Sequence, residues 1–180
     1  MYDLFVLGEL MTEGTHGYVL QERLTHAVGP IRRISSGTLY PLLSRFVKKG
    51  WISLQLGGEQ QRRRQRKIYE LTTAGRERFL ELMAEPIPIS TDAELMFHFK
   101  MAYFQYVTKE VQLACLKQYL EYLHVNLRYV NAESQMIRSK QIPEQKRIQL
   151  LRMFDHRRHV AEADIAWVRQ EIDRIKTPSD

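Results

Sequence analysis

The sequence of residues 35–52, SSGTLYPLLSRFVKKGWI, predicts a short amphipathic helix. Its apolar residues recur three or four positions apart, which is the spacing of one helix face: Leu39, Leu42, Leu43, Phe46 and Val47. Gly50 marks the end of the pattern, because glycine is common directly after a helix. We assign Leu39, Leu42, Leu43 and Phe46 to the protein core. The opposite side of the helix is then exposed and available for another task.

The start of this helix is unusual, because Ser-Ser-Gly-Thr and then Pro41 occupy it. Proline lacks a backbone N–H, which costs nothing in a first turn, where such donors have no partner within the helix. Pro41 lies in the first turn if Gly37 or Thr38 caps the helix, whereas a cap at Ser36 costs one hydrogen bond. In either case the hydroxyls of Ser35, Ser36 and Thr38 lie at the positive end of the helix dipole. This arrangement favours the binding of a phosphate.

Two other helices are predicted before this stretch. Leucines at every third position indicate a helix over residues 3–12. A second helix follows two glycines, covers residues 17–28 and ends at Gly29-Pro30. The helix within residues 35–52 is therefore the third of the chain.

A β-hairpin with a basic loop is predicted after the third helix. Residues 51–56, WISLQL, and residues 67–72, KIYELT, alternate in the manner of strands. Between them lies GGEQQRRRQ at residues 57–65, and a helix over residues 74–84 follows the second strand. The loop contributes to a basic segment: residues 44–67 hold eight cations and one anion, a local charge of +7, although the whole chain has a net charge of +6. Such a concentration of positive charge favours a polyanionic partner.

Three helices, a basic hairpin and a further helix are the order of a winged helix-turn-helix domain. In such domains one helix enters the major groove, and the hairpin reaches along the DNA backbone or into the minor groove. Cations of the hairpin neutralise phosphates, whereas the exposed side of the third helix contacts bases. The predicted DNA-binding residues are Ser35, Ser36, Thr38, Tyr40, Ser44, Arg45, Arg62, Arg63, Arg64, Arg66 and Lys67. For Tyr40, packing beside the hairpin is the alternative to DNA contact.

The second half of the chain is predicted to be helical. The segment EPIPIST at residues 85–91 is the one clear linker, so we divide the chain into residues 1–84, this linker and residues 92–180. Long helices are expected over residues 108–140 and after a break at residues 141–143. Their apolar seams favour packing between helices or between subunits. The predicted dimerisation residues are Leu116, Leu120, Leu123, Leu127, Ile165, Val168, Ile172 and Ile175. The fold class is thus mainly α, with a two-stranded wing and an all-helical C-terminal dimerisation domain.

Three segments, GYVLQERL, GTLYPLLSRFVKKGWI and RKIYELTTAGRERF, resemble the PadR family of bacterial transcriptional regulators. The resemblance covers residues 3–84, and its motifs are specific in combination: Gly17-Tyr18, residues 39–43, Gly50 and residues 69–75. The C-terminal half resembles the larger PadR subfamily. The resemblance implies a homodimer that binds an operator with two-fold symmetry on double-stranded DNA and represses a promoter until a small aromatic effector releases it. The loop VGPIRRISS lacks the aromatic pair that this subfamily often has before the third helix, so an effector site built on it is not carried over.

Other candidate sites are weaker. The aromatic-rich residues 96–106 suggest an effector site with His98, Tyr103 or Tyr106, although core packing is the more frequent role of such a pattern. His156 and His159 lie near Asp155, but a solvated helix surface explains them better than a metal site. Cys115 is expected to be buried and unreactive.

Composition excludes several classes of protein. No stretch approaches the ~18 apolar residues of a membrane span, no signal peptide is evident and the single cysteine fits a reducing cytoplasm. No phosphate loop, nucleophile elbow or cofactor motif is present, so neither an enzyme nor a cofactor is expected. Two alternatives remain: a DNA-binding adaptor whose C-terminal helices bind a partner protein, and a binder that coats DNA without sequence preference.

Overall fold

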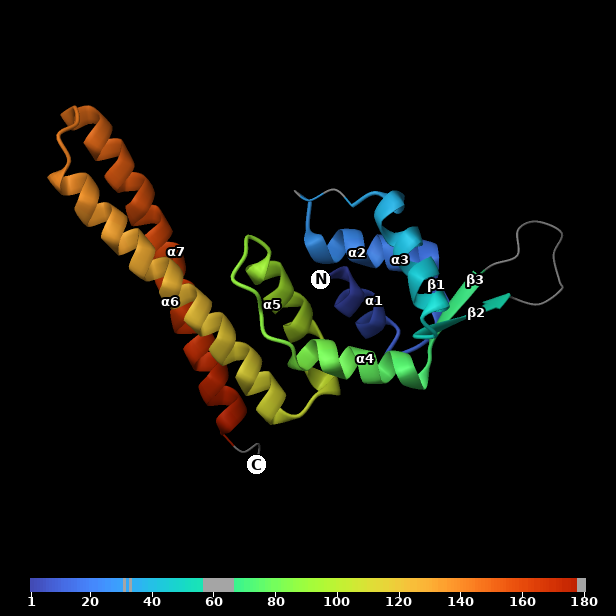
Figure 1. The fold of residues 1–180 in the computed structure, drawn as a ribbon. Coiled ribbons are helices and arrows are strands. Elements are labelled where there is room, and N and C mark those ends of the chain that lie inside the picture. The colour runs from blue at the N-terminus through green and yellow to red at the C-terminus, as the bar shows by residue number, and fades with distance from the viewer. Residues whose placement is uncertain (31, 33, 57–66, 178–180) are drawn as a thin grey trace. The chain divides into compact units, whose positions relative to one another are not determined.

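A computed structural model of the protein describes residues 1–30, 32, 34–56 and 67–177 (Figure 1). The chain forms two units, which we describe separately. The first unit comprises Met1–Glu85 and His98–Thr108, and the second comprises Pro86–Phe97 and the chain from Lys109 onward. The sequence-based division at residues 85–91 stays a prediction, although His98–Thr108, which it assigned to the C-terminal domain, belongs to the first unit.

The first unit has the predicted order of elements, and its winged helix-turn-helix fold is confirmed. The elements are α1 (Tyr2–Glu9), β1 (Thr15–His16), α2 (Gly17–Val28), α3 (Ser36–Lys48), β2 (Ile52–Leu56), β3 (Lys67–Leu71) and α4 (Thr73–Ala84). The core contains the apolar faces of the helices, including the four α3 residues that the sequence assigns to it: Leu4, Leu7, Leu20, Leu24, Leu39, Leu42, Leu43, Phe46, Ile52, Phe79 and Met83. The opposite face of α3 is consequently exposed.

The predicted two-stranded hairpin is present as β2 and β3, and a third strand, β1, joins the same sheet. Its order is β1-β3-β2, and both pairings are antiparallel. The additional strand β1 has two residues and pairs Thr15 with Tyr69 and His16 with Ile68. Two residues are too few for a periodic pattern, so the sequence did not reveal this strand. It connects the start of α2 to the base of the hairpin.

The junction between the hairpin and α4 is closely packed. The Thr72 hydroxyl donates to the Gly50 carbonyl at 2.6 Å and accepts from the Gly75 N–H at 3.0 Å, which caps α4. A Cβ atom at Gly75 would lie 1.9 Å from the carbonyl oxygen of Trp51. Only glycine therefore fits at this position without a shift of the backbone.

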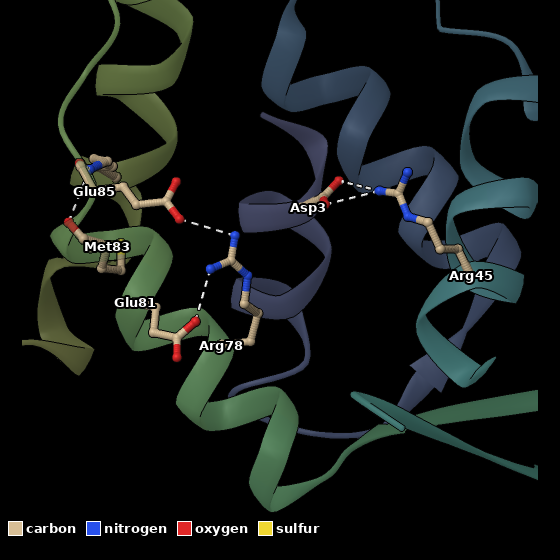
Figure 2. Close-up of polar contacts among 7 residues, drawn as sticks. Asp3, Arg45, Arg78, Glu81, Met83 and Glu85 are labelled. Carbon is tan, nitrogen blue, oxygen red and sulfur yellow. Dashed lines mark hydrogen bonds and ion pairs between the residues drawn. The ribbon is translucent and has the colours of Figure 1, made fainter. Parts of the chain in front are cut away.

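A buried lysine binds the C-terminal end of α4. Lys100, in α5 (Ala93–Ala102), is 1% exposed, and its ammonium donates to the carbonyls of Met83 (3.0 Å) and Glu85. The last carbonyls of a helix have no partner within the helix, and a cation at this end also opposes the helix dipole. The positions of Met83 and Glu85 are drawn in Figure 2. Lys100 thus fixes the C-terminal part of α5 to the DNA-binding unit.

The second unit is a hairpin of two long helices. α6 (Lys109–Ser139) and α7 (Glu144–Lys176) lie side by side and antiparallel (Figure 1), joined by a short turn. Their mutual packing buries five of the eight predicted dimerisation residues within one chain: Leu116, Leu123, Ile165, Val168 and Ile172. Leu120, Leu127 and Ile175 are partly exposed. Of the two roles that the sequence left open for the seam, the packing between helices is the one observed in the single chain.

Within the described ranges, none of the helices combines the length and the apolar content that a membrane-spanning segment requires.

Candidate nucleic-acid interface

The exposed side of α3 carries most of the predicted DNA-binding residues of this helix. Thr38, Tyr40, Ser44 and Arg45 are exposed, and Ser35 is exposed directly before the helix. The exposed Lys48 and Lys49 add positive charge at the other end. The backbone of Ser36 is described, but its side chain is outside the described part of the structure.

The helix begins earlier than either alternative that the sequence suggested. Ser35 is the N-cap, and the Thr38 N–H donates to the Ser35 carbonyl at 3.0 Å. Pro41 consequently lies inside the helix and has no N–H to donate to the Gly37 carbonyl. Of the two outcomes that the sequence left open for Pro41, the structure shows the loss of one ladder hydrogen bond and not a position in the first turn. The Ser35 side chain makes no capping hydrogen bond, so the first N–H groups of α3 are directed at the region before the helix.

A hollow of about 660 Å³ lies beside this end of α3. Its lining includes Ser35 and Thr38, and, from the end of α2 and the following loop, His26 and Arg32. Two hydroxyls, an imidazole and a guanidinium next to a helix N-terminus are the groups that bind a phosphate. The two hydroxyls were predicted from the sequence, but His26 and Arg32 were not, because the approach of the end of α2 and its following loop to the start of α3 depends on the folded arrangement.

Tyr40 packs on one side and is exposed on the other. A Cβ atom at Gly17 would lie 3.0 Å from a ring carbon of Tyr40 and 3.3 Å from one of Tyr69, so the two rings close over this glycine. Burial, and next the proximity of Tyr40, raise the pKa of the Tyr69 phenol. Tyr40 nevertheless remains 44% exposed. The packing fixes the position of its ring, and the contact with DNA stays a prediction.

Arg45 is held by an acidic residue of α1. Its Nη2 atom donates to both carboxylate oxygens of Asp3 at 2.9 Å (Figure 2). The side chains of Arg45 and Asp3 are 51% and 29% exposed, respectively. This pair could not be predicted from local sequence patterns, because the two residues are far apart in the chain. A guanidinium in a fixed position at the surface suits contact with a base or a phosphate.

The base of the hairpin has a second group of cations around Trp51. The Lys49 ammonium lies 4.3 Å from the centroid of the Trp51 ring, and the Arg78 guanidinium lies 5.6 Å from it. Arg78 also pairs with Glu81 at 2.8 Å and Glu85 at 3.0 Å (Figure 2). Arg78 is therefore neutralised by carboxylates, whereas Lys49 remains available to a phosphate.

Five of the predicted DNA-binding residues belong to the wing. Arg62, Arg63, Arg64 and Arg66 lie outside the described residues. Lys67 is described at the start of β3, where its side chain is exposed and its carbonyl oxygen lies 3.0 Å from Nδ1 of His16. Their contacts with DNA remain predictions.

The predicted effector residues occupy different environments. Tyr103 is buried, and its hydroxyl donates to Glu9 at 3.0 Å and lies 3.2 Å from the Phe5 carbonyl. Burial and the Glu9 carboxylate both raise the pKa of the Tyr103 phenol. The hydroxyl of Tyr106 lies 2.5 Å from that of Thr12, whereas His98 is exposed. Core packing accounts for Tyr103 and Tyr106, and an effector role for the three residues stays a prediction.

The structure describes the environments of Cys115 and of the C-terminal histidines. Cys115 is 2% exposed, as its position beside Leu116 predicts. Asp155 pairs with Arg158, and its carbonyl lies 2.8 Å from Nδ1 of His159. Among the described residues, no three histidine, cysteine or acidic side chains gather in the manner of a metal site.

The first unit matches a known family. Residues 6–81, which include α1 to α3, the sheet and most of α4, match the model of the "Transcriptional regulator PadR-like family". This segment is therefore similar to PadR-like transcriptional regulators, and it makes up less than half of the chain. The match supports the predicted class, a DNA-binding transcriptional regulator.

Solved structures of PadR-like regulators are similar to this chain at low identity. Bacillus subtilis PadR in complex with operator DNA is 16% identical, with 97% of both chains covered and a TM-score of 0.44. The same protein in complex with p-coumaric acid is 15% identical, with 97% of this chain and 98% of that chain covered and a TM-score of 0.41. A PadR-like regulator from Bacillus cereus is 20% identical, with 97% of both chains covered and a TM-score of 0.40. No curated protein matches the sequence.

Proposed function

We propose that this protein is a homodimeric repressor that binds an operator with two-fold symmetry and leaves it when a small aromatic effector binds. The observation that supports this most strongly is the exposed face of α3 with a polar, cationic hollow at its start. The opposite face of the same helix is buried in the core, and this packing holds the exposed surface in one orientation. Repression of a neighbouring gene follows if the operator overlaps a promoter.

The two parts of the surface have different tasks in this proposal. Arg32, Ser35 and Thr38 bind one phosphate at the start of α3, and the cations of the hairpin bind others. These contacts set the position of α3 but contain no sequence information. Tyr40, Ser44 and Arg45 then meet base edges in the major groove.

The relatives support the choice of partners. Bacillus subtilis PadR has been solved with operator DNA and with p-coumaric acid. We infer that this chain also has a specific operator and a small aromatic effector. Since its proposed partner is the chromosome, we further infer a cytoplasmic location.

Dimerisation is proposed to use the outer surface of the α6–α7 hairpin. Five predicted residues are already buried inside one chain, so a second copy must find other apolar side chains. The hairpin offers large exposed ones away from its own seam: Tyr129, Met136, Ile148, Met153 and Trp167. Apolar area of this kind is typical of interaction surfaces. Two copies would present two α3 helices to one duplex.

Footprinting of the purified protein on the DNA upstream of its own gene tests the proposal. Specific binding predicts one protected region with two related half-sites, and protection that survives an excess of unrelated DNA. Uniform protection of all fragments would favour the alternative binder without sequence preference. Specific protection that no small aromatic compound weakens would favour the ligand-independent adaptor. The absence of any DNA binding at low ionic strength would contradict the proposal.

A further inference from the structure

A groove runs along one side of the α6–α7 hairpin, entirely within the second unit. Its volume is about 230 Å³. One stripe of α6 and one stripe of α7 form its walls, and Glu94, at the start of α5, closes one end. The wall residues are Tyr119, Tyr122, Leu123, Asn126 and Val130 from α6 and His156, Arg157, Val160, Ala161 and Asp164 from α7.

One end of the groove is acidic. Burial is the first cause that raises the pKa of the Tyr119 phenol, and the negative charges of Asp164 and Glu94 follow. Both carboxylates therefore lie near this hydroxyl. Within the described parts of the chain, neither carboxylate has an ion-pair partner.

Most of the Tyr119 side chain is buried, whereas its hydroxyl is accessible from the groove. The residue is 4% exposed and lines the groove. Its ring stacks on Phe97 with centroids 3.9 Å apart, which fixes its orientation. Among the residues that the structure describes, none forms a hydrogen bond with its hydroxyl. This accessible hydroxyl is consequently available for a hydrogen bond with a group that enters the groove.

The rest of the groove is apolar or aromatic. Leu123, Val160 and Ala161 form its middle, and Tyr122 stacks beside Tyr119 with centroids 5.8 Å apart. At the far end, the Arg157 guanidinium lies over the rings of Tyr129 and Phe154 at 5.8 and 5.9 Å. The groove thus has negative charges at one end and a positive charge at the other. The volume lies below the range of about 300–1,000 Å³ that is typical of pockets for drug-sized ligands.

We propose that this groove binds a small primary amine in its protonated form, with an apolar or aromatic body. The ammonium group has three N–H donors, and the acidic end offers three acceptors: the carboxylates of Glu94 and Asp164 and the phenol oxygen of Tyr119. The organic body packs on Leu123, Val160 and Ala161, and the ring faces of the tyrosines favour the positive charge. A carboxylate ligand at the acidic end would be repelled. The role of the amine as the releasing effector rests on the proposed function, whereas its binding does not.

Isothermal titration calorimetry of the full-length protein with 2-phenylethylamine at pH 7 tests the binding. We expect one saturable site per chain. The neutral analogue 2-phenylethanol and the anionic analogue 3-phenylpropionate should bind at least about tenfold more weakly, because they lack the charge-assisted hydrogen bonds. The trimethylated amine, which keeps the charge but has no N–H donor, should be intermediate. Equal affinity for the amine, the alcohol and the acid would overturn the proposal.

Three variants locate the site. Asp164→Asn and Glu94→Gln keep the shape of each side chain and remove its charge, so each should weaken 2-phenylethylamine binding by about tenfold or more. Tyr119→Phe removes only the hydroxyl and should weaken binding by a smaller factor. Glu162→Gln is the matched control, because Glu162 is an exposed acid on α7 that does not line the groove; it should leave binding unchanged. Unchanged binding in both charge-removing variants would place the amine elsewhere and overturn the assignment.

A second copy of the chain is the competing occupant of the groove. If the amine fails to bind and Asp164→Asn changes the dimer dissociation constant in sedimentation, the groove is an interface and the proposal is wrong. Mobility-shift assays on the operator then separate binding from function. If the amine binds but does not release the operator, the binding site is supported and its proposed regulatory role is wrong. Failure of the protein to bind any operator would remove the proposed function and leave the calorimetric result standing.

Discussion

Arg45 of α3 donates from one nitrogen, Nη2, to both carboxylate oxygens of Asp3 in α1, each at 2.9 Å. The pair joins the proposed DNA-contacting helix to the first helix of the chain. Because both side chains are partly exposed, the ion pair adds little to stability, on the order of 0–1 kcal/mol. Its more important effect is geometric, since it holds a long, flexible guanidinium in one position. The other nitrogens of Arg45 remain able to donate to DNA.

Arg45→Ala should relax the sequence preference of the protein rather than weaken all binding equally. If Arg45 contacts a base, its loss removes roughly 1–3 kcal/mol of discrimination at one base pair. Affinities for a set of operator variants, each with one base pair changed, would measure this. Arg76→Ala, at an exposed arginine of α4, is the control. Equal weakening on every operator variant would identify Arg45 as a contact to the DNA backbone.

Ser35→Asp should abolish tight DNA binding without unfolding the protein. Aspartate is as good an N-cap as serine, so α3 should keep its stability. Its negative charge, however, would occupy the hollow in which we place a phosphate. Mobility shifts and thermal unfolding would be measured together. Ser90→Asp, in the exposed segment before α5, introduces the same charge away from the hollow and should retain binding. Normal DNA affinity in Ser35→Asp would exclude the hollow from the interface.

Arg63→Ala with Arg64→Ala should weaken binding to all DNA and reduce its salt dependence. Each phosphate contact that is lost should lower the slope of log K against log salt by about one, because fewer counterions are released. Titrations of specific and unrelated DNA at several salt concentrations give the two slopes. An unchanged slope on both DNAs would mean that these arginines do not contact phosphates.

Gly75→Ala and Gly37→Ala should have opposite effects on stability. The added methyl group at Gly75 would lie 1.9 Å from the Trp51 carbonyl oxygen, so the backbone must shift and the free energy of unfolding should fall by about 3 kcal/mol. At Gly37 the nearest atom, Oγ of Ser35, is 3.4 Å away. There the better helix propensity of alanine should raise stability by up to about 1 kcal/mol. Chemical denaturation measures both, and a neutral Gly75→Ala would contradict the close packing of α4 on the hairpin.

Substitutions in the α6–α7 seam and on its outer surface should give different defects. Ile165→Asp buries a charge within one chain and should unfold the hairpin, which circular dichroism would detect as a loss of helix. Met136→Glu with Met153→Glu changes exposed side chains and should give folded monomers with weak operator binding. Sedimentation and circular dichroism separate the two outcomes. Folded dimers in the double methionine variant would place the dimer interface on another surface.

Local pattern predicted much of this structure, because the strongest determinants of helices and strands lie within short windows. Each such signal lies within a short stretch of sequence. Examples are the apolar spacing of α3, the alternation of β2 and β3 and the breaks at Gly29 and Gly50. Contacts between distant segments left no such pattern. The pair of Asp3 with Arg45, the strand β1 on β3 and the closure of Tyr40 over Gly17 depend on the folded arrangement.

Two predictions, the start of α3 and the partner of the C-terminal seam, show why local sequence patterns were not sufficient. Turn chemistry left Ser36, Gly37 and Thr38 as alternative caps of α3, whereas the observed N-cap is Ser35 and Pro41 lies inside the helix. A heptad seam has the same sequence whether its partner is another segment or another chain. Only the short turn before Glu144 brings α7 back onto α6.

The enclosure of the seam within one chain separates folding from association. A monomer emerging from the ribosome can complete its C-terminal hairpin without waiting for a second copy. In the proposed dimer, the joining of two copies would depend on the outer surface of the hairpin, so the fraction of dimer should follow the cellular protein level. Occupancy of a two-fold operator would in consequence rise more steeply than in proportion to that level, which gives a self-limiting control of gene expression when the regulated gene is its own.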